Sequence, residues 1–235
     1  MKNKIFLTLL CAIAPGLVKA QLAIAPEIGI SSCSMKVMPP TPYRLSSSGS
    51  LTGGKIGAIG DIGLSEHLYF QSGLFFSIKG DTKSLAYSVN DSVQNIDQKT
   101  QIHYLELPVN VLFKTSTQGL GRIFFGLGAS IDYTIGGRNT IHNYGHIGSL
   151  SSFDTTTNTT IQGGRDISKI DVGLNFIAGY EFRWGLFLRL YYSYGFTDIA
   201  TFLDESDKNR SYGFSAGYFL GKSRHSNLAN ELIAE

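Results

Sequence analysis

Two histidines in the short segment HNYGH, His142 and His146, are the residues whose type and spacing come closest to a metal site. Imidazole nitrogens are common zinc ligands, but a zinc site takes three or four protein ligands. Asp154 is a loose further candidate, and no Cys or third His stands nearby. We therefore expect a solvated polar loop here, with no bound metal and no other cofactor.

The remaining histidines, His67, His103 and His225, lack a neighbouring serine and acid at positions that can be placed together as a catalytic set. The chain contains no HExxH motif, and we find no nucleophile elbow, the strand-to-helix turn that presents a catalytic serine. Membrane barrels can assemble a triad from distant strand ends, because catalytic groups are defined by geometry and not by order in the chain. An enzyme stays an open alternative, and our expectation is a protein without catalytic residues.

Composition favours β structure and argues against nucleic-acid binding. The 235 residues carry a formal net charge of only +2, and Lys and Arg are spread along the chain without forming a basic stripe. High counts of Gly (27), Tyr (12) and Phe (15) favour strands. After the N-terminal segment, no run reaches the roughly 18 consecutive apolar residues of a spanning helix. The pattern therefore excludes a helical membrane protein.

The N-terminus predicts export. Residues 1–20 have the pattern of a cleaved signal peptide, in which two lysines precede an apolar run over 5–14 and small residues stand before the cleavage point. The mature chain would keep a single cysteine, Cys33, and could form no internal disulfide. We expect one folded domain over 21–221 and a short polar tail over 222–235.

Alternation of apolar and polar residues with period two dominates the mature chain, and this pattern predicts strands. It is clearest over Lys169–Gly195, where two alternating runs flank Arg183-Trp184-Gly185 as in a tight antiparallel hairpin. Eight segments show the alternation: 22–30, 54–64, 68–79, 102–114, 122–135, 170–182, 186–195 and 210–220. Their apolar faces suit lipid outside, and their polar faces suit a closed lumen.

The connections between these segments alternate in length. Long polar connections cover 31–53, 80–101, 136–168 and 196–209, and short turns cover 65–67, 115–121 and 183–185. Outer-membrane barrels have an even number of strands, with short periplasmic turns and long extracellular loops. Closure would also leave no unpaired strand edge in lipid. We therefore predict an all-β fold, an eight-stranded antiparallel up-and-down transmembrane β-barrel in the outer membrane.

Charged residues of both signs fall on the polar faces of these strands. The inward candidates are Lys55, Asp61, Lys79, Glu106, Arg122, Asp132, Asp171, Glu181, Arg183 and Arg189. An eight-stranded barrel has a lumen that side chains fill, and buried charges are costly unless they pair. We expect internal ion pairs, and an ion or proton path along these groups is the functional alternative.

Aromatic residues gather toward the strand ends, where an interfacial girdle is expected. This group comprises Tyr104, Tyr133, Tyr180, Trp184, Tyr192, Tyr194, Tyr212 and Tyr218. An aromatic ligand-binding box would instead need these side chains to converge on one loop. The girdle is the interpretation that we adopt.

Four segments resemble an established family. YLELPVNVLFK (104–114), FFGLGASIDY (124–133), DVGLNFIAGYEF (171–182) and LRLYYSYGFTDI (188–199) are similar to the outer-membrane β-barrel domain common in Bacteroidota, which includes PorT-like proteins. The resemblance spans Gln21 to Gly221 and implies an eight-stranded outer-membrane barrel. PorT-like members are associated with secretion machinery, but no residue here carries that role over. The chain departs from many barrels in continuing beyond the aromatic Phe219.

Three functional hypotheses follow. The leading one is a non-enzymatic, monomeric barrel in outer-membrane lipid, whose loops, chiefly 31–53 and 136–168, contact a cell-surface partner. The second, which the resemblance implies, is an accessory subunit of an outer-membrane secretion or assembly complex. The third is a soluble lipocalin-like barrel, in which the apolar faces would point inward onto a small ligand.

Overall fold

The computed structural model describes residues 22–36, 45–89, 92–117, 119–147, 151–197 and 208–220. The expected signal peptide, 1–20, and the expected tail, 222–235, lie outside this part of the chain. The strands are β1 (Leu22–Lys36), β2 (Leu45–Gly63), β3 (Leu68–Val89), β4 (Ser92–Lys114), β5 (Gly121–Ile147), β6 (Ser151–Ile161), β7 (Ile170–Phe182), β8 (Leu186–Gly195) and β9 (Lys208–Tyr218). No helix among the described residues is long and apolar enough to cross a membrane.

The nine strands form one antiparallel sheet, and eight of them close into a ring. The order is β4-β3-β2-β1-β9-β8-β7-β5, and β4 pairs with β5 to complete the ring. In the described residues, β6 pairs only with β5 and stands outside the ring. The predicted eight-stranded up-and-down barrel is therefore confirmed, with a ninth strand that the sequence did not predict.

Most large apolar side chains face outward from the barrel, and most charged side chains of the ring face inward, next to a buried cluster that includes Phe75, Phe124 and Phe187. Ile28, Leu127 and Leu190 expose 62%, 51% and 63% of their surface, whereas Glu27 and Arg189 expose 2% and 3%. Alternation along each strand produces this division, because neighbouring side chains point to opposite faces of the sheet. The arrangement fits lipid around a polar lumen, and it is the reverse of what the soluble ligand-binding alternative requires.

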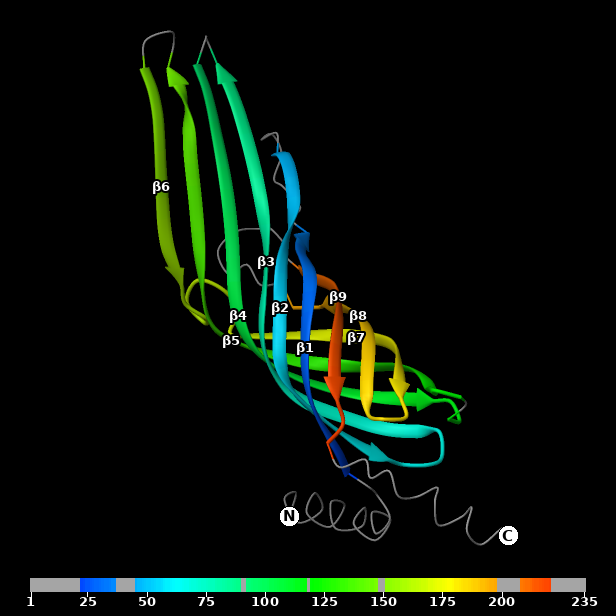
Figure 1. Cartoon of the computed structure of the whole chain (residues 1–235). Coiled ribbons are helices and arrows are strands. Elements are labelled where there is room, and N and C mark those ends of the chain that lie inside the picture. Colours follow the sequence, from blue (N-terminus) through cyan, green and yellow to red (C-terminus); the bar gives the residue numbers. More distant parts are fainter. Residues whose placement is uncertain are drawn as a thin grey trace, which may run out of the picture.

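Three of the expected long loops are largely strand. Residues 80–101 form a hairpin, because β3 continues to Val89 and β4 begins at Ser92. Likewise, β5 continues to Ile147 and β6 occupies much of 136–168, while β1 and β2 extend into 31–53. Figure 1 shows the upper parts of β3 to β6 rising well beyond the ring. These four upper segments, 80–89, 92–103, 136–147 and 151–161, are called the extracellular sheet below.

Two prolines lie where the strand ladders are interrupted. Pro108 belongs to β4, and the β3–β4 pairing breaks between Ser72–Val109 and Phe75–Glu106. Pro26 precedes Glu27, the residue at which the β1–β9 ladder begins. Proline lacks an N–H donor, so it is tolerated in a sheet only at such positions.

The predicted hairpin is formed by β7 and β8. The Gly185 N–H donates to the Phe182 carbonyl at 3.0 Å, which closes the turn. Gly185 has φ +103°, a conformation that glycine adopts without a steric penalty. The turn therefore lies at the short-loop, periplasmic end, with Trp184 exposed by 56%.

Candidate functional site

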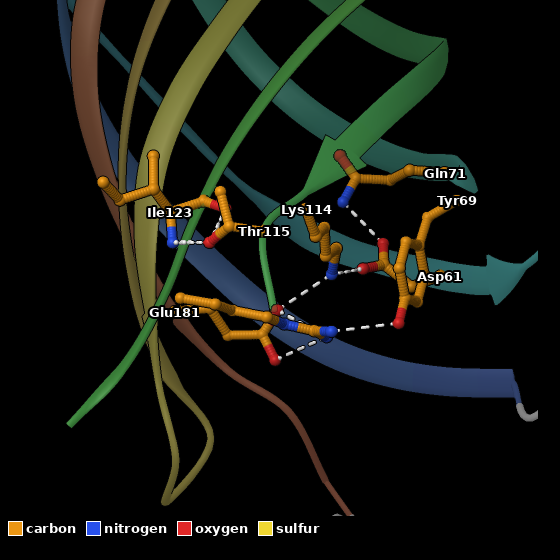
Figure 2. Close-up of polar contacts among 8 residues, drawn as sticks. Asp61, Tyr69, Gln71, Lys114, Thr115, Ile123 and Glu181 are labelled. Carbon is orange, nitrogen blue, oxygen red and sulfur yellow. Dashed lines mark hydrogen bonds and ion pairs between the residues drawn. The ribbon is translucent and has the colours of Figure 1, made fainter. Parts of the chain in front are cut away.

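Ion pairs inside the lumen tie distant strands together. At the periplasmic end, the Lys114 ammonium of β4 lies between the carboxylates of Asp61 on β2 and Glu181 on β7. The distance from Lys114 Nζ to Glu181 Oε2 is 2.9 Å. All three residues are 2% exposed. A lysine shared by two carboxylates is thus buried inside the barrel (Figure 2).

Further polar groups complete this lower cluster. Arg122 donates through Nη2 to Glu181 Oε1 at 3.0 Å and through Nη1 to the Tyr69 hydroxyl at 2.9 Å. Gln71 Nε2 donates to Asp61 Oδ1 at 2.6 Å. Each carboxylate therefore has at least two partners, as a buried charge needs in order to be stable.

A second cluster is centred on Glu27 of β1. Lys55 Nζ lies 3.1 Å from Glu27 Oε1, and Arg189 Nη1 lies 3.0 Å from Glu27 Oε2. The Ser215 hydroxyl also donates to Glu27 Oε1, at 2.7 Å. Lys55 Nζ stands 4.0 Å from the centre of the Tyr191 ring, which contributes a cation–π contact. This cluster therefore joins β1, β2, β8 and β9.

The contact of Ser215 with Glu27 explains the role of a motif that the sequence analysis did not identify. Residues Gly213 to Gly217 read GFSAG, which has the spacing GxSxG of a nucleophile elbow. In the structure the segment lies within β9, and Ser215 is fully buried against Glu27. A catalytic serine of that type sits exposed on a strand-to-helix turn. Ser215 is therefore a structural hydrogen-bond donor in the barrel.

A third cluster occupies the extracellular end of the lumen. Lys79 Nζ of β3 lies 2.6 Å from Asp132 Oδ2 and 3.1 Å from Glu106 Oε2. Asp132 stands directly opposite Asp171 in the β5–β7 register. Two carboxylates therefore face one another across neighbouring strands, with Lys79 bound to one of them.

The Asp171 carboxylate accepts a hydrogen bond from the side-chain amide of Asn209. Asn209 Nδ2 donates to Asp171 Oδ2 at 2.8 Å and to the Tyr104 hydroxyl at 3.2 Å. Tyr104 has no exposed surface, so it belongs to the lumen. Its expected place in the interfacial girdle was wrong, because position 104 shares the inward face of β4 with Glu106. Tyr212 and Tyr218, by contrast, face outward with 63% and 44% exposure.

Nine of the ten charged residues that the sequence placed inward are in the lumen. Arg183 is the exception: it lies exposed in the β7–β8 turn, since the strand ends at Phe182. Glu27 and Lys114 were missing from the predicted set, although both occupy inward positions of their strands. Alternation could have identified both, but which charges would meet depends on the stagger of the strands.

The two histidines of the HNYGH segment are not brought together by the structure. His142 Nε2 lies 2.8 Å from Asp154 Oδ1, across the β5–β6 pair. His146 is opposite Ser152, and four residues along a strand correspond to roughly 13 Å, too far for one ion to bind both rings. The described residues contain no group of three metal-ligating side chains with suitable geometry.

The structure shows the surroundings of three other residues that the sequence analysis considered, His67, His103 and Cys33. His67 Nδ1 lies 3.0 Å from the Lys114 carbonyl oxygen, and the His103 ring packs 5.8 Å from that of Phe76. Cys33 is 1% exposed and close to the Ser31 hydroxyl. His225 lies outside the described residues.

The extracellular sheet presents polar side chains outside the lumen. Its outermost strand, β6, has the sequence SSFDTTTNTTI, and nearly all of its side chains are exposed. The Thr140 hydroxyl on β5 donates to Asn158 Oδ1 at 2.8 Å, which adds to the β5–β6 ladder. The extracellular sheet therefore ends at a threonine-rich strand, β6, and one edge of this strand is unpaired in the described part of the chain.

Comparison with solved structures finds similarity to outer-membrane proteins. Ail of Yersinia pestis, in complex with the heparin analogue sucrose octasulfate, has 14% identity and a TM-score of 0.37, covering 85% of this chain and 99% of its own. Neisserial surface protein A has 11% identity and a TM-score of 0.42, covering 86% and 99%. OprG from Pseudomonas aeruginosa also has 11% identity and a TM-score of 0.42, covering 86% and 97%. No curated protein matches the sequence.

The family itself is identified from the sequence. The model of the outer membrane protein β-barrel domain matches residues 19–201, which is most of the chain. The closed ring, the outward apolar faces and the polar lumen agree with that match. The chain therefore belongs to the outer membrane protein β-barrel domain family and resides in the outer membrane of a Gram-negative bacterium.

Proposed function

We propose that this protein is a non-enzymatic surface-interaction barrel that binds an extended segment of a partner protein along the free edge of β6. The observation that carries the proposal is the pairing of β6, which has β5 on one side and no described strand on the other. An antiparallel strand directs alternate pairs of N–H and C=O groups to each side. Roughly half of the backbone groups of β6 are therefore available for strand addition.

The composition of β6 supports this role. Proteins usually protect an edge strand with lysine, proline or a bulge, because a bare edge pairs with other chains. Over Ser151–Ile161, β6 has no lysine or proline and a single charge, at Asp154. Its pairing with β5 is continuous, without a register shift. Threonine favours strands, so the edge is ordered and still open to a partner.

The packing of side chains in the lumen supports a role at the cell surface and argues against transport through the barrel. Most of its charged side chains form ion pairs with one another, in three clusters. An eight-stranded ring leaves little space beyond that needed for its own side chains. The most accessible recognition groups are consequently those of the extracellular sheet.

The test is site-specific photo-crosslinking in intact cells. A crosslinking side chain at Thr159 in β6 should yield an adduct, and the same group at Asn95 in β4, an interior strand of the extracellular sheet, should not. Thr155→Pro and Thr156→Pro remove adjacent N–H groups, of which one faces β5 and the other the free edge. The variant that preserves the β5–β6 ladder, judged by hydrogen exchange, should abolish the adduct. Equal adducts from both sites, insensitive to either proline, would refute the proposal.

A secretion or assembly complex, which the resemblance to PorT-like proteins implies, is the finer alternative for the partner. Deleting 151–161 while following both barrel assembly and protein secretion separates the two. Lost secretion with a folded barrel would favour the complex. Unchanged secretion would leave a partner at the cell surface.

A further inference from the structure

A groove lies on the lipid-facing side of the barrel, where β8, β9, β1 and β2 are neighbours in the ring. It has a volume of about 490 Å³, within the usual range of small-molecule sites. Outward side chains that line it include Ile30, Leu190, Phe214, Tyr212, Ser32 and Thr52. The register places Ser32 opposite both Thr52 and Tyr212, so the groove crosses the strands at one height.

The groove changes from apolar to cationic along the strands. Its periplasmic side continues into the apolar band, through Ile28. On its extracellular side the next outward residue of β9 is Arg210, which pairs with Ser34 and with Tyr194. The Arg210 guanidinium lies 5.2 Å from the centre of the Tyr194 ring. The stacked ring holds the cation at the edge of the groove.

One hydrogen-bond donor of the Arg210 guanidinium lacks an acceptor. Its Nε is buried and has no hydrogen-bond partner among the described residues. A buried donor without an acceptor costs free energy, and phosphate oxygens suit the planar guanidinium. Lys208 lies two residues earlier on the same face of β9, roughly 7 Å away along the strand. The extracellular end of the groove is thus suited to an anion.

We propose that this groove binds one phosphorylated lipid of the outer leaflet, with an acyl chain between Ile30, Leu190 and Phe214 and the phosphate on Arg210. The location of the groove favours a lipid over a peptide or a soluble anion, because the groove lies next to the apolar band and opens into the bilayer. Charge complementarity selects an anionic headgroup, because basic residues near a membrane surface attract it. The phosphate would accept hydrogen bonds from the guanidinium of Arg210, a residue that is partly exposed.

Native mass spectrometry of the purified full-length protein in detergent tests this site. Dioleoylphosphatidylglycerol is the anionic probe, and dioleoylphosphatidylcholine is its zwitterionic match with the same chains. The first phosphatidylglycerol should bind more tightly than the first phosphatidylcholine. Arg210→Gln should weaken phosphatidylglycerol binding by about fivefold, since each basic residue at such a surface contributes about that factor.

Matched variants separate the headgroup from the chain. Lys169→Gln removes another exposed cation, outside the groove lining, and should leave binding unchanged. Ser32→Phe fills the groove and should weaken both lipids, whereas Ala129→Phe adds the same bulk to β5 without effect. Heat-modifiable gel migration verifies that each variant is folded. Equal binding by Arg210→Gln and Lys169→Gln would overturn the proposal, as would displacement of the lipid by inorganic phosphate.

Discussion

Lys114→Met is the substitution that most directly tests the charge clusters in the lumen. Lys114 bonds to both Asp61 and Glu181, and all three are buried. Removing one partner of a buried ion pair typically costs about 3–5 kcal/mol, because the remaining charge is left without compensation. Glu181 keeps Arg122, at 3.0 Å, so the loss falls mainly on Asp61. We therefore expect the free energy of unfolding to decrease by about 3 kcal/mol, near the lower limit.

Adding Asp61→Asn to Lys114→Met should restore much of the lost stability. The double variant removes the uncompensated carboxylate, and replacing a whole buried pair by neutral groups is often close to neutral. The amide at position 61 can still accept a hydrogen bond from Gln71, as Asp61 does at 2.6 Å. We expect the double variant to lie within about 1 kcal/mol of the natural protein.

Urea unfolding in lipid vesicles provides the measurement, with the single Trp184 as the fluorescent reporter. Lys99→Met is the control, because Lys99 is exposed on the extracellular sheet and such surface changes stay within about 0.5 kcal/mol. If Lys114→Met behaves like this control, or if Asp61→Asn gives no rescue, Lys114 does not compensate the charge of Asp61. The lumen would then be hydrated enough to solvate Asp61 without a partner.

Two other properties can be measured without a binding partner. Asp97 raises the pKa of the Tyr144 hydroxyl in the extracellular sheet. The folded state therefore binds the Tyr144 hydroxyl proton more strongly than the unfolded state does. The resulting stabilisation is present at neutral pH and is lost as pH rises through the raised pKa. Asp97→Asn should lower that pKa in an ultraviolet titration, and an unchanged pKa would contradict the electrostatic cause. Spin labels at Leu127, 51% exposed, and Ser130, 2% exposed, should differ in access to a lipid-soluble relaxation agent. Equal access would contradict the assignment of the two faces.

Much of the barrel could be predicted from local patterns. The strands β7 and β8 have the predicted bounds, because each alternates over its full length between lipid and lumen. The alternation of long and short connections also predicted the number of strands in the ring. Both signals are local, since a side chain's face depends only on its position along the strand.

The extracellular sheet could not be predicted in the same way. Residues 92–101 and 151–161 have water on both faces, so no apolar alternation distinguishes these strands from loops. Their order comes from pairing: β4 continues beside β3 and β5, and β6 adds to β5. Threonine content favours strands here, but the polar composition of 136–168 predicts a long connection.

The sequence alone determined which residues face lipid and which face the lumen, because a period of two is built into any extended chain. Only the tertiary structure decided which of them meet. Lys114 lies on Asp61 and Glu181, 53 and 67 residues away in the chain, and Arg210 reaches the edge of a groove formed by four strands. These contacts depend on how the strands are staggered around the closed ring, and stagger is a property of the whole barrel.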